Sequence, residues 1–340
     1  MACSCRVVVN LRHNTRQGGP PSGCMEEGVV LLVACDADEA SSVMADALRS
    51  RGVFVPYGMA EGADVLAAGR VRLWCRTGTH LHEDNLDLRY TEALGESVQE
   101  VLFLSKHVAS SERPCLTVHP IGVPHLSEGE TPPFGGRAGQ SPPPSVRMAA
   151  IWRALLAVRN DPRIPEFEVS LEVTHHGPWL TAPSAFLEIG STSTTWSHGG
   201  AGQVWADLLL DVLSEELQGR DAPNQPPHHP VLITLGGGHY APRANMMAAE
   251  QGALLGHMLA RHSLPFEPSD EGTGVGGAWK HAINESLAST RRAHPGRTVV
   301  VSMDKKSFRG WERAPLLEHL ASLKVQVVSA DEHRAMLSTE

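Results

Sequence analysis

Short apolar runs alternate along the chain with segments whose apolar residues recur at helical spacing. Residues 29–34 form such a run, and Asp36 and a periodic segment over 37–49 follow it, which is typical of a buried strand leading into an Asp-capped helix. Similar runs predict strands over 71–74, 101–104, 115–118, 167–174, 185–189, 231–235, 298–302 and 324–328. Helical spacing predicts helices over 146–159, 203–217, 243–261 and 315–323.

This alternation predicts an α/β fold with a mostly parallel or mixed sheet and helices on its faces. Three Pro- and Gly-rich stretches, 126–145, 219–230 and 263–277, interrupt the pattern. Strand-like runs continue on both sides of them, so we interpret them as long loops of a single domain, some of them covering a site. The predicted organisation is an N-terminal extension over 1–28, one domain over 29–332 and a C-terminal tail over 333–340.

Charge and composition limit the possible partners. The formal net charge is −9, whereas a protein that grips nucleic acid over a broad surface is usually basic. Any contact with RNA must therefore be local, and no DNA partner or stable protein partner is expected. No stretch approaches the roughly 20 apolar residues of a membrane helix, so no membrane association is expected. The six cysteines are scattered, which favours reduced thiols over a disulfide framework.

The N-terminal extension has a composition of its own. Residues 1–25 contain Arg6, Arg12 and Arg16 and no acidic residue. We expect a cytoplasmic protein. The alternative is a chloroplast or mitochondrial location, with this Arg-rich segment acting as a transit peptide.

Histidines follow several of the predicted strands. In the strand over 167–174, apolar residues alternate with polar ones, and His175 and His176 come directly after it. Pro178 cannot continue a ladder, so both imidazoles should lie at the carboxyl end of the strand. If the extended conformation persists, Glu172 points to the same side as His176.

The same arrangement recurs after other strands. Because ligands bind outside the carboxyl ends of strands in open α/β sheets, these residues are expected to meet on one rim and form a site. The consecutive glycines among them can present N–H groups to an anion. The residues that follow other strands are Lys106, His107, His119, Gly236, Gly237, Gly238, His239, Tyr240, Lys305 and Lys306.

Some familiar motifs are missing, and one segment has two interpretations. The sequence contains no P-loop, no G-x-S-x-G elbow and no H-E-x-x-H motif. Residues 191–195 are best interpreted as the N-cap region of a helix, and a phosphate bound to its free N–H groups is the alternative.

The motifs around these histidines resemble those of the archaeal- and plant-type D-aminoacyl-tRNA deacylases (D-Tyr-tRNA deacylases). The resemblance runs from about residue 29 to the last strand, and the Pro-rich insert after Leu126 resembles the plant branch. It implies a fold similar to the phosphorylase and peptidyl-tRNA hydrolase class, hydrolysis of the ester between a D-amino acid and the tRNA 3′ end, and zinc as a metal. The matching segments are DEASSVMADAL (38–48), EDNLDLRY (83–90), FLSKHVASSERPCLTVHPIG (103–122), EVTHHGP (172–178), FLEIGSTSTTW (186–196), GGGHYAPR (236–243) and DKKSFRGW (304–311).

An aminoacyl ester is already activated, so hydrolysis requires a positioned water, a base and stabilisation of the oxyanion. We expect His176 to act as base or metal ligand, oriented by Glu172, with His239 opposite it and the amides of Gly236–Gly238 as oxyanion donors. If zinc is present, three of the residues His107, His119, His175, His176, His239 and Glu172 could hold it. Participation of the terminal ribose hydroxyl is equally compatible with the sequence.

The expected substrate is D-aminoacyl-tRNA, held at its acceptor end. Basic residues near the C-terminal strand, with Trp311 among them, are candidates for that contact: Arg291, Arg292, Arg297, Lys305, Lys306, Arg309 and Arg313. Lys106, Lys280 and Tyr240 are further candidates for substrate binding. The alternatives are a metal-dependent amidase or peptidase acting on a small substrate, and a non-enzymatic regulator that binds metal or phosphate.

Overall fold

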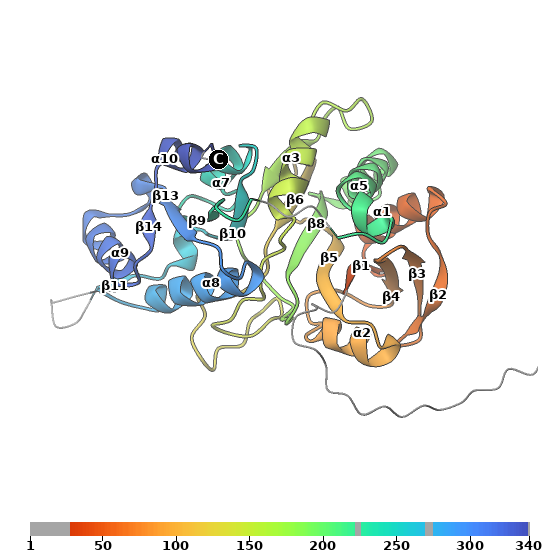
Figure 1. The fold of residues 1–340 in the computed structure, drawn as a ribbon, viewed down its shortest axis with the longest axis horizontal. Helices are drawn as coiled ribbons and strands as arrows, with labels where there is room; N and C mark the ends of the chain where they lie inside the picture. The colour runs from red at the N-terminus through yellow and green to blue at the C-terminus, as the bar shows by residue number, and fades with distance from the viewer. Residues whose placement is uncertain (1–27, 222–225, 269–274, 339–340) are drawn as a thin grey trace, which may run out of the picture.

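The fold was obtained as a computed structural model that describes residues 28–221, 226–268 and 275–338 (Figure 1). The transit-peptide alternative for residues 1–25 lies outside the described residues. None of the helices in the described ranges is both long enough and apolar enough to cross a bilayer.

A mixed sheet of eight strands, counted within the described residues, forms the larger half of the molecule, in the order β2-β3-β4-β1-β5-β8-β6-β7. Strands β4, β1, β5 and β8 are parallel, whereas β6 runs antiparallel to β8 and parallel to β7. The bounds are β1 (Val29–Cys35), β2 (Val55–Ala60), β3 (Ala63–Ala68), β4 (Val71–Arg76), β5 (Val98–Lys106), β6 (Cys115–His119), β7 (Glu168–Leu171) and β8 (Ser184–Gly190).

Helices cover both faces of this sheet (Figure 1). On one face, α1 (Glu39–Ser50), α3 (Met148–Val158) and α5 (Gly199–Val212) pack on strand residues such as Leu32, Leu104 and Leu187. On the other face, α2 (Leu86–Leu94) packs on alternate residues, including Phe103 and Phe186. The expected helix is confirmed, but its N-cap is Asp38 rather than Asp36, since the Asp38 carboxylate accepts a hydrogen bond from the backbone N–H of Ser41 at the start of α1.

A second, parallel sheet in the order β10-β9-β13-β14 forms the other half, at the left of Figure 1. Helices α7 and α10 pack on one of its faces, and α8 and α9 pack on the other. The bounds are β9 (Val231–Leu235), α7 (Pro242–Ala248), β10 (Leu254–Leu259), α8 (Trp279–Ala293), β13 (Val299–Met303), α9 (Gly310–Ser322), β14 (Gln326–Val327) and α10 (Ala330–Leu337). Short elements complete the chain: α4 (Ser193–Trp196), α6 (Ser214–Leu217), β11 (Glu267–Pro268), β12 (Val275–Gly276), η1 (Arg261–Ser263) and η2 (Lys305–Ser307).

The two sheets share one hydrophobic core. Val173, which follows β7, belongs to the same buried cluster as Leu232 of β9 and Met258 of β10. The backbone N–H of Val173 donates to the carbonyl of His239, and that of Thr174 donates to the carbonyl of Met258 at 2.7 Å. The α/β class with helices on both sides is therefore confirmed, and the two separate sheets are joined by this shared core.

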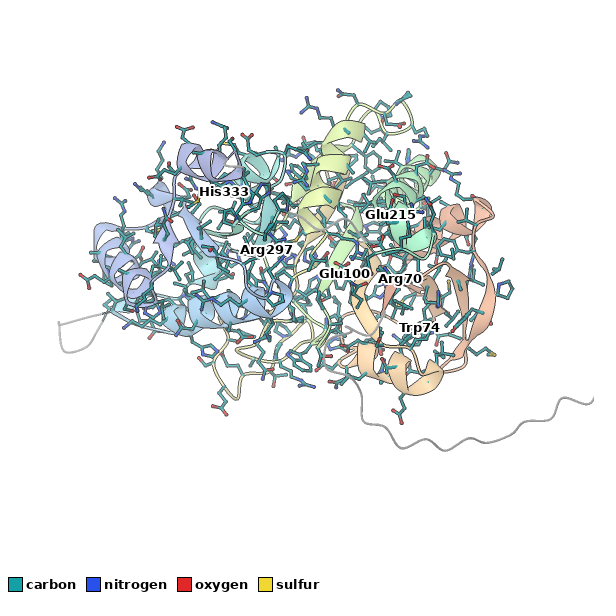
Figure 2. All side chains as sticks on the ribbon, in the orientation of Figure 1. Arg70, Trp74, Glu100, Glu215, Arg297 and His333 are labelled. Atoms are coloured by element: carbon teal, nitrogen blue, oxygen red, sulfur yellow. The ribbon has the colours of Figure 1, made fainter. Side chains whose placement is uncertain are left out.

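Two predictions about elements are wrong. The periodic segment 243–261 is not one helix, because α7 ends at Ala248 and β10 follows it. Gly252 separates the two elements with a φ of +83°, a conformation that favours glycine. The predicted tail also belongs to the fold, since His333 (labelled in Figure 2) is buried on α10.

Candidate active site

Five imidazoles and two carboxylates meet between the two sheets. Three overlapping groups have ligand atoms within 4.8 Å of one another, and together they comprise His107, His119, Glu172, His175, His176, Glu188 and His239. The expected convergence of distant histidines is confirmed. The resulting cluster, which we call the imidazole cluster, includes all the predicted catalytic residues and all the candidate metal ligands.

The expected reason for this convergence, a common rim of parallel strand ends, is wrong. Because β6 is antiparallel to β8, His119 pairs with Phe186, and Thr117 pairs with Glu188. Directly paired residues project from the same face of a sheet. The cluster therefore lies on a face of the large sheet, and the turn after β9 of the small sheet brings His239 onto it.

Glu172 lies at the centre of the cluster and is fully buried. Its carboxylate oxygens lie 2.7 Å from His239 Nε2, 3.0 Å from His107 Nδ1 and 3.8 Å from His175 Nε2. The predicted orientation of His176 by Glu172 is wrong. The backbone leaves the extended conformation at His176, where φ is +43°, and its Nδ1 instead lies 2.6 Å from the carbonyl of Gly177.

The imidazoles of His119, His175 and His176 share one hydrogen-bonding pattern. Their Nδ1 atoms lie 3.1, 2.7 and 2.6 Å from the backbone carbonyls of Pro120, Val173 and Gly177. A carbonyl can only accept, so in the neutral imidazole each Nδ1 carries the proton and each Nε2 keeps its lone pair. This is how proteins usually prepare a histidine as a metal ligand.

Buried polar atoms without hydrogen bonds are also consistent with a cation in the cluster. Among the described residues, neither oxygen of Glu172 has a well-aligned hydrogen-bond donor, and His119 Nε2 has no partner. His119 Nε2 lies 3.6 Å from Glu188, which is too far for a hydrogen bond. Two buried carboxylates require nearby positive charge, which imidazolium groups or a metal ion can provide.

Burial and charge affect the pKa values of these groups in opposite directions. Burial lowers the pKa of His176 to about 3 and that of His175 well below its usual value, so both are neutral at pH 7. Burial also opposes protonation of His107 and His119. The neighbouring carboxylates outweigh it, with Glu188 prominent for both, and raise the pKa of each imidazole. Burial favours the protonated form of Glu188, but His119 and His107 keep its pKa well below the usual value.

Glu188 was not among the predicted site residues. It lies on β8 and accepts a hydrogen bond from Thr117 Oγ1 at 3.0 Å, and a second interaction joins its carboxylate to His107 Nδ1 at 3.3 Å. A signal for it was present in the sequence, because it is the one charged residue within the apolar run 185–189. A charged residue in a buried strand needs a partner.

The glycine turn after β9 does not offer three free amides. The N–H of Gly236 donates to the carbonyl of Leu259 at 2.8 Å, and that of Gly237 donates to Ser307 Oγ at 2.7 Å. The prediction that both amides are oxyanion donors is therefore wrong. The Gly238 N–H has no acceptor among the described residues and is the remaining candidate.

The predicted substrate-binding residues are distributed unevenly. Tyr240 belongs to the cluster, since its hydroxyl lies 3.3 Å from His107 Nε2. Lys106 precedes His107, and its ammonium group lies over the ring of Trp196. Lys305 and Lys306 are exposed on η2, beside the glycine turn. Lys280 is exposed on α8, and its ammonium group lies over the ring of its neighbour Trp279 rather than beside a cluster residue.

The Pro-rich segment 126–145, together with residues 121–125, forms a strap beside the cluster. The N–H of Gly122 donates to the carbonyl of His176 at 2.9 Å, and the N–H of Gly177 donates to the carbonyl of Phe134 at 2.9 Å. Farther along, the carbonyl of Gly139 lies 2.7 Å from His281 Nε2 on α8. The strap thus connects both halves of the molecule and fixes the backbone around His176.

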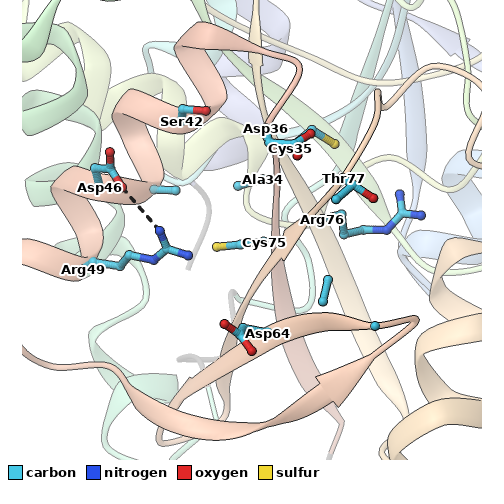
Figure 3. Close-up of a pocket in the computed structure, with 13 residues that line it drawn as sticks. Ala34, Cys35, Asp36, Ser42, Asp46, Arg49, Asp64, Cys75, Arg76 and Thr77 are labelled. Atoms are coloured by element: carbon cyan, nitrogen blue, oxygen red, sulfur yellow. Dashed lines mark hydrogen bonds and ion pairs between the residues drawn. The ribbon is translucent and has the colours of Figure 1, made fainter.

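A separate cavity of about 400 Å³ lies between α1 and the ends of β1 and β4 (Figure 3). Asp46 and Arg49 in its wall form an ion pair with each other. None of the residues that line it belongs to the imidazole cluster.

Residues 191–195 have the conformation predicted for them. Thr192 is the N-cap of α4, and Thr195 completes a capping box with it. The N-cap interpretation is therefore confirmed, and the cap uses the backbone N–H groups of Thr192 and Thr195, which donate to Thr195 Oγ1 at 3.1 Å and to the Thr192 carbonyl at 2.9 Å.

Known proteins have sequences similar to this one. The profile of a family described as D-aminoacyl-tRNA deacylase matches residues 94–328. A D-aminoacyl-tRNA deacylase of Arabidopsis thaliana is 39% identical over 315 residues, covering 88% of this chain and 98% of the relative. One from Methanosarcina mazei is 30% identical over 267 residues, covering 78% of each chain.

A solved structure shares the fold. The crystal structure of a conserved protein of unknown function superimposes with a TM-score of 0.73 at 25% identity, covering 92% of this chain and 98% of the other. The family match covers β5–β8 of the large sheet and the whole small sheet, and it includes every residue of the imidazole cluster. The chain belongs to the D-aminoacyl-tRNA deacylase family.

Proposed function

We propose that this chain is a hydrolase that cleaves the ester bond of D-aminoacyl-tRNA and releases the free D-amino acid and tRNA. Its family membership supports this activity. The observation that carries the proposal is the position of Glu172, a buried carboxylate held between His107 and His239. A carboxylate that orients an imidazole is a recurring arrangement for activating a nucleophile.

His239 is the better base of the two predicted candidates. Its Nε2 faces Glu172 at 2.7 Å, and 39% of its side chain is exposed, so a water molecule and the substrate can reach the ring. His176 is a weaker base, because a pKa of about 3 leaves its nitrogen with little affinity for a proton. In this scheme His239 removes a proton from water as the oxygen attacks the ester carbonyl, and the exposed N–H of Gly238 faces the developing oxyanion.

We also propose a zinc site formed by the Nε2 atoms of His119, His175 and His176. Their lone pairs, fixed by the carbonyl contacts of the Nδ1 atoms, fit a metal that prefers imidazole ligands. When bound, zinc would supply Lewis acidity and lower the pKa of a coordinated water. The group His107, Glu172 and His239 also has donor atoms close enough for a cation, and metal analysis of variants distinguishes the two.

The proposed substrate contact is the exposed group Lys305, Lys306 and Arg309, with Trp311 beside it at 38% exposure. Ser307 links this group to Gly237, two residues before His239. Cationic side chains next to an aromatic ring suit the phosphates and bases of a single-stranded RNA end.

Incubation with D-Tyr-tRNA and L-Tyr-tRNA tests the function. We expect rapid release of D-tyrosine and slow release of L-tyrosine. Release of neither amino acid would contradict the proposal and favour a metal-dependent amidase or a non-enzymatic regulator. A panel of small amides would then separate those two alternatives.

The variant His176→Ala tests the metal site. We expect it to keep its fold, to lose bound zinc and to lose turnover, because two imidazoles rarely hold zinc tightly. Zinc content is measured by atomic absorption, and turnover by release of D-tyrosine. His228→Ala, which alters an exposed loop histidine, is the control. A variant at position 176 that retains zinc and the wild-type rate would contradict the assignment.

A further inference from the structure

A row of aromatic rings lies directly beside the imidazole cluster. Phe103 of β5 pairs with Phe186 of β8, and Phe186 pairs on its other side with His119 of β6. Directly paired residues project from the same face of a sheet, so the three rings lie in one row across three adjacent strands. All three side chains are fully buried. Phe186 therefore lies between the phenyl ring of Phe103 and an imidazole of the cluster.

The rings in this row pack in geometries that aromatic pairs prefer. The ring of Phe186 stacks on that of His119, with an interplanar angle of 13° and ring centroids 5.4 Å apart. It meets the ring of His176 edge to face, with an interplanar angle of 79° and centroids 4.7 Å apart. The ring of His175 stacks in turn on that of His119, with centroids 4.0 Å apart. One phenyl ring thus contacts two of the three imidazoles of the proposed zinc site, and His119 connects it to the third.

Hydrogen bonds alone do not fix the planes of these two imidazoles. The Nδ1 atoms of His119 and His176 each contact the carbonyl of the next residue in the chain, so both contacts are local. The torsion that rotates an imidazole about its Cβ–Cγ bond has broad minima, so packing is needed to hold it at one value. Rotation of the ring changes the direction of the Nε2 lone pair, and a functional site needs such directions fixed to within about 10 to 20°. The ring of Phe186 is a packing contact that both imidazoles share.

We propose that Phe186 is a positioning residue of the zinc site: its ring holds the planes of His119 and His176 so that their Nε2 lone pairs point at the same ion. This inference rests on the proposed function, because it needs the zinc site of that proposal. The phenyl ring has neither a hydrogen-bond donor nor an acceptor, so it leaves both Nε2 lone pairs to the metal. Replacing a residue that orients metal ligands typically costs about 10- to 100-fold in metal affinity.

Phe103 is the matched control for Phe186. Both phenylalanines belong to the same buried cluster and lie on neighbouring strands, with ring centroids 4.7 Å apart. Within the part of the chain that the structure describes, the ring of Phe103 contacts the rings of Phe186 and His80 and no imidazole of the zinc site. Loss of either phenyl ring removes similar packing from the core, but only the loss of Phe186 releases the imidazoles of the zinc site.

The test compares Phe186→Leu with Phe103→Leu in the full chain. Zinc affinity is measured by competition with a chromophoric chelator, and the visible spectrum of the cobalt-substituted protein reports the geometry of the ligands. Urea unfolding measures how much stability each variant has lost. We expect Phe186→Leu to bind zinc about tenfold or more weakly with an altered cobalt spectrum, and Phe103→Leu to stay within about threefold of the wild-type affinity with the wild-type spectrum. Phe186→Met, which also lacks a ring, replaces Phe186→Leu if that variant does not fold.

Three results would overturn the positioning role. Wild-type zinc affinity and an unchanged cobalt spectrum in Phe186→Leu would do so, and this is the result expected if His107, Glu172 and His239 hold the metal instead. Equal losses of affinity in the two variants would also do so, because they would follow from the general loss of core packing. Wild-type protein that binds neither zinc nor cobalt would contradict the zinc site itself. Release of D-tyrosine by the wild type is measured separately, so that failure of the deacylase proposal is distinguished from failure of this one.

Discussion

At the scale of single residues, the histidines could be predicted from the sequence and their partners could not. All five histidines of the imidazole cluster follow apolar runs, and a polar residue after such a run can be recognised from the sequence alone. These histidines are His107, His119, His175, His176 and His239. Which carboxylate each imidazole contacts depends on strand order. Glu188 contacts His107 and His119 because β8 lies between β5 and β6, and that neighbourhood has no counterpart in the sequence.

Glu188→Gln tests the importance of this missed carboxylate. The amide keeps the size of the side chain and can still accept from Thr117, but it removes the negative charge that raises the pKa of His107. We expect the single-turnover rate of D-Tyr-tRNA hydrolysis to fall by about 100-fold or more, while the affinity of the variant for tRNA stays unchanged. Glu318→Gln, at an exposed position of α9, is the control. A rate equal to that of the wild type would assign Glu188 a purely structural role.

At the scale of elements, most strands were predicted close to their observed bounds, and the errors have physical causes. The pattern over 231–235 matches β9, because a parallel strand buried on both faces is apolar throughout. The segment that contains β10 has helical spacing, yet it forms a strand because Gly252 ends the helical segment and β9 offers an open edge. Tertiary pairing overrides local periodicity there.

The strap and the segment after β7 approach each other so closely that only glycine fits. A Cβ atom at Gly177 would collide with the backbone of Gly135 and Gly136. We therefore expect Gly177→Ala to lower the free energy of unfolding by about 2 kcal/mol or more, because the backbone must shift, and to lower activity by displacing His176. Denaturant unfolding and D-tyrosine release measure these effects.

Gly199→Ala is the matched control for that variant. A Cβ atom at Gly199 meets no heavy atom within 4 Å, and the residue begins α5, where alanine is tolerated. We expect its unfolding free energy to be equal to or slightly above that of the wild type. Equal stabilities of the two variants would show that the strap is not seated as closely as described.

At the scale of the whole molecule, His257 joins the two halves. It lies on β10, with Nδ1 3.0 Å from Thr174 Oγ1, after β7, and Nε2 3.1 Å from Ser289 Oγ, on α8. The Ser289 hydroxyl donates to the carbonyls of Ser141 and Pro142 in the strap, so it accepts from His257 Nε2–H. Nδ1 then accepts from Thr174, and the neutral ring is fully satisfied.

Acid should weaken this junction. Burial lowers the pKa of His257 in the folded protein to about 3, whereas an unfolded histidine titrates near 6.5. Between these values the unfolded chain binds a proton that the folded chain does not, so stability is lost as the pH falls below about 6.5. Each such histidine contributes a slope approaching 1.4 kcal/mol per pH unit.

His257→Gln removes this titration. We expect the variant to be less stable at pH 7, since it loses hydrogen bonds, but its unfolding free energy should fall less steeply between about pH 6.5 and pH 4. Urea unfolding at a series of pH values measures the slope. His228→Gln, at an exposed position, should keep the wild-type slope. If His257→Gln keeps it as well, another group accounts for the acid sensitivity.

The net charge of −9 makes the position of the cations important, because a polyanion is repelled by most of the surface. The basic residues that lie close together in the sequence are divided between opposite ends of the strands of the small sheet. Lys305, Lys306 and Arg309 follow β13, beside the glycine turn. Arg291, Arg292 and Arg297 precede β13 and lie at the other ends of its strands, since Thr298 pairs with the first residue of β9. Only the first group is near the imidazole cluster.

Lys306→Ala and Arg291→Ala therefore form a matched pair. Each removes one exposed charge, so both lower the net charge equally, but only Lys306 belongs to the proposed substrate contact on η2, which Ser307 links to the glycine turn before His239. A lost phosphate contact lowers the slope of log affinity against log salt by about 0.7 to 1. We expect Lys306→Ala to bind tRNA more weakly with this reduced slope, and Arg291→Ala to retain the wild-type slope. Equal slopes for both variants would mean that tRNA binding responds only to the total charge of the protein. That result would contradict the proposed substrate contact at η2.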